Sequence, residues 1–124
     1  MPRRLWTKLA VNAGINPVTA LARVDNGAVL EEPLAGIARG AARETASAAA
    51  AAGVDLDPAE AVAAMEGVAR DTAENVSSMR QDVEAGRPTE VDAINGHVVD
   101  RLGADAAPGN ATLASLVRAR AESE

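Results

Sequence analysis

The sequence predicts an all-α fold in which about six helices form one compact bundle. Signals that start and end helices recur along the whole chain, and no segment alternates apolar and polar residues as a strand would. Hydrophobic residues make up 48% of the chain, and about half of these are alanine, so helices can approach closely. A length of 124 residues is that of one domain, which we expect to span residues 1–124.

The first helix is predicted from about residue 3 to residue 23. It contains Pro17, which lacks a backbone N–H and disfavours helical geometry at the residue before it. We therefore expect a kink between residues 14 and 17. The segment Asp25–Gly27 indicates the helix end, because Asn-Gly readily adopts the left-handed conformation of a C-terminal cap.

Two further helices are predicted in the middle of the chain. Pro33 is expected at the first position of a helix that ends at Gly53, since proline favours the first turn and glycine the C-terminal cap. The segment Asp57–Glu60 combines an N-cap aspartate, a proline at the first helical position and a glutamate at the third. The helix that starts there is predicted to reach about Asn75.

Three shorter helices complete the predicted bundle. Ser78 is the expected N-cap of a helix that stops at Gly86, and Thr89 that of a helix that ends before Gly103. The last helix follows Pro108. Its apolar face consists of Leu113, Leu116 and Val117.

Charge and composition exclude several functions. The net charge of −6 argues against binding to nucleic acid or to an anionic membrane surface. No apolar run is long enough to span a bilayer, and the N-terminus lacks the pattern of a signal peptide, so we expect a cytoplasmic protein. There is no cysteine, and His97 is the only histidine and has no companion ligands in sequence, so no metal site is expected.

A row of polar residues lies within the otherwise apolar first helix. Lys8, Asn12 and Asn16 are four residues apart and therefore share one helix face. Because each buried polar group without a partner costs about 1–3 kcal/mol, a bound polar ligand is one way to satisfy this face. The alternatives are a surface lysine with its stem along the helix, a core amide at Asn12, and a kink residue at Asn16.

Three separated blocks resemble, in the same order, the C-terminal domain of the ketopantoate reductase (2-dehydropantoate 2-reductase) family. They are residues 6–21 (WTKLAVNAGINPVTAL), 75–82 (NVSSMRQD) and 86–96 (GRPTEVDAING). The resemblance implies a helical C-terminal domain of the 6-phosphogluconate-dehydrogenase-like type, preceded in the family by a Rossmann domain that binds NADPH. No G-x-G-x-x-G motif occurs in this chain, so we expect that Rossmann domain to be absent from it.

The resemblance also implies which residues are catalytic. Lys8 matches the family's catalytic lysine, which would donate a proton to the alkoxide that forms when a hydride reaches the keto carbon. Glu90 matches the second key polar residue, which would pair with Lys8 and accept a hydrogen bond from a substrate or ribose hydroxyl. The alternative for Glu90 is a first-turn glutamate that interacts with the helix dipole.

Four more residues match substrate-contact positions of the family. They are Asn12, Asn16, Asn26 and Ser78. Amides both donate and accept hydrogen bonds, which suits a ligand that carries carboxylate and hydroxyl groups. Asn26 could equally be a left-handed helix cap, and Ser78 could be a helix N-cap without contact to a ligand.

The function implied by the resemblance is the substrate-binding and catalytic half of an NADPH-dependent oxidoreductase that reduces 2-dehydropantoate to pantoate. NADPH would be bound mainly by a Rossmann domain in the same or another chain, and the 124-residue chain alone would be inactive. The expected partners are a small 2-oxo acid, the Rossmann domain and further copies of the chain. Two alternatives stay open: reduction of another 2-oxo acid, and a stand-alone helical module for binding or oligomerisation without catalysis.

Overall fold

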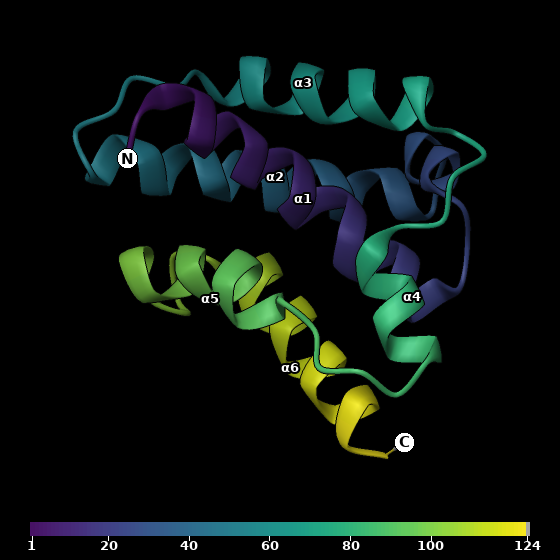
Figure 1. The fold of residues 1–124 in the computed structure, drawn as a ribbon. Coiled ribbons are helices and arrows are strands. Elements are labelled where there is room, and N and C mark those ends of the chain that lie inside the picture. Colours follow the sequence, from purple (N-terminus) through teal and green to yellow (C-terminus); the bar gives the residue numbers. More distant parts are fainter. Residues whose placement is uncertain (124) are drawn as a thin grey trace.

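The structure, a computed structural model, describes residues 1–123. Within this range the chain forms six α-helices and one 3₁₀ helix and contains no strand, which confirms the predicted all-α class (Figure 1). The elements are α1 (Arg3–Ala22), η1 (Asn26–Leu30), α2 (Leu34–Ala51), α3 (Pro58–Asp71), α4 (Ser78–Glu84), α5 (Val91–Leu102) and α6 (Pro108–Ser123).

Helix α1 is the central element and contacts each of the other helices. In Figure 1, α3 lies on one side of α1 and α5 and α6 lie on the other, while α2 overlaps α1 in this view and contacts α5 and α6 as well. The short α4 packs near the C-terminal end of α1. Residues on α1 are therefore close to segments from every later part of the chain.

The end of α1 differs from the prediction. Arg23, and not Asn26, adopts the left-handed conformation that ends the helix, with φ of 57°. Asn26 instead opens η1, and its backbone N–H donates to the carbonyl of Asn75 at 3.0 Å. The prediction of Asn26 as a left-handed cap is therefore wrong, because a long-range contact determines its conformation.

Most other helix starts lie within one residue of the prediction. The Oδ1 atom of Asp57 accepts from the N–H of Ala59 at 2.8 Å, as expected of an N-cap. Helix α2 starts one residue after Pro33. The N-cap position of α5 is Glu90, although the hydroxyl of Thr89 still accepts from the N–H of Val91 at 3.3 Å.

The third helix is shorter than predicted. It ends at Asp71, where we expected it to continue to about Asn75. The residues that follow form a loop. The carbonyl of Ala73 in this loop accepts from the N–H of Gly27 of η1 at 3.0 Å. A Cβ atom on Gly27 would lie 2.8 Å from that of Ala73, so only glycine allows this approach. The loop is thus held against η1 and becomes a wall of the site described below.

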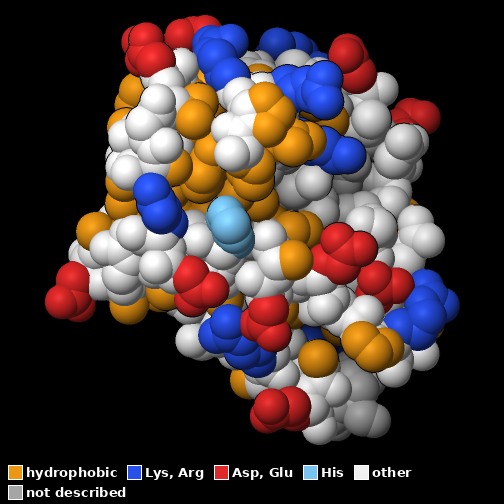
Figure 2. Space-filling model, turned by 60° about the vertical axis from the view of Figure 1, so that its left-hand side comes forward, with side chains coloured by type: hydrophobic (Ala, Val, Ile, Leu, Met, Phe, Trp, Pro, Cys, Tyr) orange, Lys and Arg blue, Asp and Glu red, His pale blue; other side chains and the backbone are white. Residues whose placement is uncertain are grey.

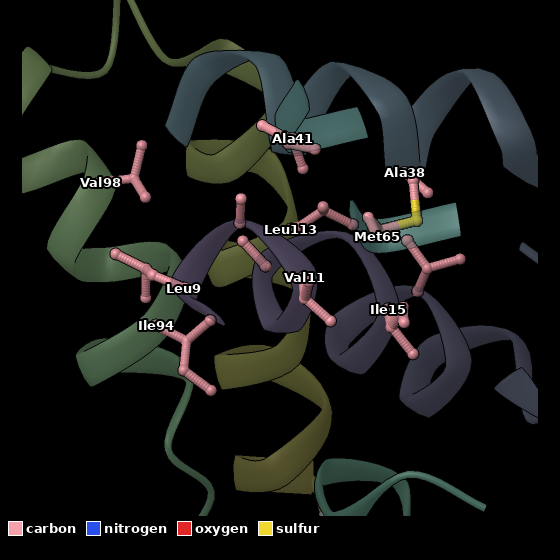
Figure 3. Packing of buried hydrophobic residues seen from close by; sticks show 14 of the residues in the cluster. Leu9, Val11, Ile15, Ala38, Ala41, Met65, Ile94, Val98 and Leu113 are labelled. Atoms are coloured by element: carbon pink, nitrogen blue, oxygen red, sulfur yellow. The ribbon is translucent and has the colours of Figure 1, made fainter. Parts of the chain in front are cut away.

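The hydrophobic core is built around α1. Figure 3 shows Leu9 of α1 beside Ile94 of α5, and Met65 of α3 reaching Ala38 of α2. Met65 is fully buried, and a Cβ atom on Gly14 would lie 3.0 Å from both the Met65 Cγ and the Ala38 carbonyl oxygen. The small residues on α1 and α2 therefore let these helices cross at close distance, as the alanine content predicted.

Candidate functional site

Five of the six predicted site residues line one cavity of about 260 Å³. These five are Asn12, Asn16, Asn26, Ser78 and Glu90. They come from α1, η1, the start of α4 and the residue before α5, which are distant in sequence. The apolar part of the lining includes Val11 and Ile15 of α1 and Ile94 of α5.

Helix α1 supplies the two amides that the four-residue spacing predicted. Asn12 and Asn16 lie on one face, and both are partly buried. Neither amide forms a side-chain hydrogen bond with another residue in the range 1–123. Their donors and acceptors are therefore open to the cavity, where a polar ligand could bind them.

Asn26 presents an acceptor that has no partner. Its side chain is 8% exposed, and its Nδ2 atom donates to the hydroxyl of Thr72 at 3.0 Å. Its Oδ1 atom is buried and accepts no hydrogen bond from the described residues. Because an unsatisfied buried acceptor costs about 1–3 kcal/mol, a hydroxyl or water in the cavity would be stabilised there.

The N-cap of α4 is the serine before the one predicted. Ser77, and not Ser78, is the N-cap: its Oγ atom accepts from the N–H of Arg80 at 3.1 Å. The Ser77 hydroxyl also lies 2.7 Å from the hydroxyl of Thr19 on α1. Ser78 is exposed and makes no cap bond, so its hydroxyl is available in the cavity.

Ser77 is a cavity residue that the sequence pattern did not single out. It is buried and lines the cavity, and its partner Thr19 is fully buried outside the cavity lining. The preference of serine for N-caps applies equally to Ser77 and Ser78, so the local sequence could not choose between them. The contact with Thr19, which is 58 residues away, distinguishes the two.

The ionisable side chains in the cavity are both acidic. Glu90 is exposed and forms no ion pair among the described residues, whereas Asp82 accepts from the Arg87 guanidinium at 3.0 Å. No arginine or lysine lines this cavity. An anionic ligand in the cavity would therefore bind to neutral hydrogen-bond donors. A positive charge could reach such a ligand only through the open side of the cavity, from a cation outside it.

Lys8 is the one cation that the sequence predicted for the site, and it lies outside the cavity. It is exposed and lines a neighbouring hollow of about 210 Å³ together with Leu5, Leu9 and His97. Asn12 lines both hollows, so the two adjoin at this residue. The expected pairing of Lys8 with Glu90 does not occur within residues 1–123. Lys8 is therefore located on the surface, as in the alternative interpretation of a surface lysine with its stem along the helix.

Two further searches of the described residues found no additional site. No group of three or more histidine, aspartate and glutamate side chains in residues 1–123 is arranged to bind a metal ion. None of the described helices is long and apolar enough to cross a membrane.

Comparison with known proteins gives a consistent result. Residues 1–121 match the family described as ketopantoate reductase PanE/ApbA, C terminal. A 2-dehydropantoate 2-reductase of Archaeoglobus fulgidus is 47% identical over 119 residues, which are 93% of this chain and 39% of that protein. The chain thus spans about two fifths of the length of this relative.

Two solved structures share the fold. A dimeric ketopantoate reductase from Staphylococcus aureus matches 98% of this chain and 43% of its own, with a TM-score of 0.85 and 27% identity. A D-mandelate dehydrogenase with NADH and anilino(oxo)acetate matches 95% of this chain and 40% of its own, with a TM-score of 0.86 and 26% identity. The arrangement of helices in this chain therefore occurs in larger oxidoreductases.

Proposed function

Because this chain belongs to the ketopantoate reductase family and corresponds to its C-terminal domain, we propose that it supplies the substrate site and catalytic groups for reduction of 2-dehydropantoate to pantoate. The observation that carries this proposal is the convergence of five family-type residues on one cavity. The local sequence does not require residues from four separate segments to meet, whereas a binding site does.

The polar groups of the cavity suit a hydroxylated 2-oxo acid. The amides of Asn12 and Asn16 can donate to a carboxylate or a keto oxygen. The free Oδ1 atom of Asn26 can accept from a substrate hydroxyl. Ser78 can donate from its exposed hydroxyl, and Glu90 can accept from the same substrate hydroxyl or from a ribose hydroxyl of the cofactor. The apolar lining would contact the branched carbon skeleton.

Lys8 would act at the open side of the cavity. When bound, NADPH would supply the hydride for reduction at C2 of the substrate, and negative charge would then develop on the C2 oxygen. The Lys8 ammonium would donate a proton to this oxygen, and Asn12, one turn away on α1, would orient the oxygen. Because Lys8 is exposed in this chain, a partner domain has to cover it before water is excluded from the reaction.

A nucleotide-binding domain in the same or another chain would provide this cover and hold NADPH. The chain has no glycine-rich turn for the phosphates. Beside Lys8, Met1 is 54% and Leu5 39% exposed, and Figure 2 shows hydrophobic side chains gathered next to the lone histidine, His97. The Nε1–H group of Trp6 is buried here without an acceptor among the described residues. A docked Rossmann domain would bury this apolar face.

The test is a fusion of this chain behind the Rossmann domain of the Archaeoglobus fulgidus relative. We expect NADPH-dependent reduction of 2-dehydropantoate by the fusion and none by the 124-residue chain alone. Lys8→Ala should lower kcat at least about 100-fold, because the proton donor is lost. Arg4→Ala removes a neighbouring exposed cation on α1 and should leave kcat unchanged. A Lys8→Ala fusion as active as Arg4→Ala would refute the role of Lys8.

Reduction of another 2-oxo acid is the second candidate. It is favoured by the similarity to a D-mandelate dehydrogenase whose complex contains anilino(oxo)acetate, an aryl-substituted ligand. The cavity here is small and its hydrophobic lining is aliphatic, which favours a branched aliphatic acid. Comparing kcat/KM of the fusion for 2-dehydropantoate, phenylglyoxylate and 2-oxoisovalerate decides between them. A preference for phenylglyoxylate would contradict the first proposal.

Self-association is the third element of the proposal. Ile37 and Leu116 are 47% and 50% exposed beside an apolar hollow between α2 and α6. A second copy of the chain would bury these side chains. Light scattering should give about twice the monomer mass, and Leu116→Glu should return the monomer. A monomer at high concentration without the substitution would contradict this.

A further inference from the structure

Pro17 leaves an acceptor open in the middle of α1. In a regular helix the carbonyl of residue 13 accepts from the N–H of residue 17. Residue 17 is a proline within α1 and has no N–H to donate. The carbonyl of Ala13, which is fully buried, therefore lacks its intrahelical partner. Such an acceptor has to be satisfied from elsewhere in the fold.

Asn95 of α5 supplies the donor for the Ala13 carbonyl. Its Nδ2 atom donates to the carbonyl oxygen of Ala13 at 3.1 Å and to the Oδ1 atom of Asn110 at 2.9 Å. Both partners are acceptors, which fixes the orientation of the amide, since a flipped group would place its oxygen against two other oxygens. The Asn95 side chain is fully buried. This is the only hydrogen bond between α1 and α5 in residues 1–123.

The side-chain amide of Asn110 extends these hydrogen bonds to α6 and α2. Asn110 of α6 donates from Nδ2 to the carbonyl of Ala41 at 3.2 Å and to Oε1 of Glu44 at 2.8 Å, both on α2. The Glu44 carboxylate also accepts from the backbone N–H groups of Gly109 and Asn110, at 2.9 Å each. The amide that reaches α1 is therefore itself held by α6 and α2.

These contacts lie next to the candidate site. Ala13 is adjacent to Asn12, and Asn95 lies five residues after Glu90 on the same helix end. The Ala13–Asn95 bond thus ties the segment that carries the α1 amides to the segment that carries Glu90. Asn95 itself does not line the cavity, so any effect on the site is indirect.

We propose that Asn95 is a positioning residue: it occupies the backbone acceptor that Pro17 opens in α1 and so fixes Glu90 relative to Asn12 and Asn16. The positioning of a binding site rests on the proposed function, whereas the pairing of Asn95 with Pro17 does not. The two parts can therefore be tested separately on the chain of 124 residues.

The pairing is tested with Asn95→Leu, Pro17→Ala and the double variant, by urea unfolding. Asn95→Leu should raise the unfolding equilibrium constant about 10- to 100-fold, because the buried carbonyl of Ala13 and the Oδ1 atom of Asn110 both lose their donor. In the Pro17→Ala background residue 17 has an N–H that can reach Ala13, so the same change should have a smaller effect, since only the Asn110 Oδ1 atom then loses its donor. Equal effects in both backgrounds would overturn the pairing.

The positioning is tested by NMR in the chain without ligand, with Val117→Ala as the control. Val117 is fully buried in α6, does not line the cavity, and has an apolar side chain that cannot donate a hydrogen bond to the Ala13 carbonyl, so it serves as the control for loss of stability. Asn95→Leu should shift the backbone amide resonances of Asn12, Asn16 and Glu90 more than Val117→Ala does, because only Asn95→Leu removes the bond that ties α5 to the Ala13 carbonyl. Equal shifts in Asn95→Leu and Val117→Ala would overturn the positioning role.

A titration with 2-dehydropantoate separates this inference from the proposed function. If the unsubstituted chain binds the acid, Asn95→Leu should weaken binding at least fivefold more than Val117→Ala, at a temperature where both are folded. Similar losses in both variants would overturn the positioning role. Absence of binding by the unsubstituted chain would count against the proposed function, and the stability and NMR results would still decide the inference.

Discussion

Replacing Ser77 or Ser78 by alanine separates two adjacent residues that the sequence pattern treats alike. The Ser77 hydroxyl caps α4 by accepting from the N–H of Arg80 at 3.1 Å, and it is 5% exposed. Loss of an N-cap costs about 1 kcal/mol, within a range of about 0.5–2 kcal/mol. The contact with Thr19 adds little, because the Thr19 hydroxyl keeps the carbonyl of Ile15 as an acceptor at 2.9 Å. We therefore expect Ser77→Ala to destabilise the fold by about 1–2 kcal/mol.

Ser78→Ala is the matched control, since it removes the same atom from the next residue. Ser78 is exposed and makes no cap bond, so its substitution should change stability by less than about 0.5 kcal/mol. Urea unfolding followed by far-UV circular dichroism measures both. With an m-value of about 1.5 kcal/mol/M, Ser77→Ala should lower the midpoint by about 1 M and Ser78→Ala should hardly change it. A loss from Ser78→Ala as large as that from Ser77→Ala would refute the assignment of the cap.

Three further substitutions test the packing around the site by the same measurement. Met65→Ala should lower the free energy of unfolding by about 2–5 kcal/mol, because the side chain is fully buried between α1 and α2. A loss under about 1 kcal/mol would mean that the surrounding helices close the space left by the removed side chain. Gly27→Ala should cost about 1–3 kcal/mol, since its Cβ would lie 2.8 Å from that of Ala73, and a neutral result would show that the loop moves freely. Glu44→Ala removes the acceptor of two N–H groups at the start of α6 and should cost about 2 kcal/mol; unchanged stability would show that water replaces the carboxylate.

The sequence predicted helix positions well because the signals that set them are local. At Asp57 the N-cap, the following proline and the bond to Ala59 lie within three residues, and the structure confirms them. The row of Asn12 and Asn16 on one face follows from helix geometry alone. The three family-type blocks likewise indicated the family to which the chain belongs.

Predictions failed where a contact distant in sequence overrides a local preference. Asn26 is followed by glycine, yet it forms no left-handed cap, because its N–H is held by the carbonyl of Asn75 and its amide by Thr72. The prediction that the third helix continues to about Asn75 was also wrong, because residues after Asp71 are hydrogen-bonded to η1 instead of continuing the helix.

The sequence by itself determined the helical class, most helix starts and the family, because these depend on residues within about one turn of each other. Only the tertiary structure decided which polar residues meet: it brings Asn26 and Ser78 to the α1 amides, leaves Lys8 on the surface, and pairs Asn95 with the carbonyl of Ala13, 82 residues away. The physical reason is that a buried donor or acceptor needs a partner, and the packing of the helices, not the local pattern, determines which one lies within reach.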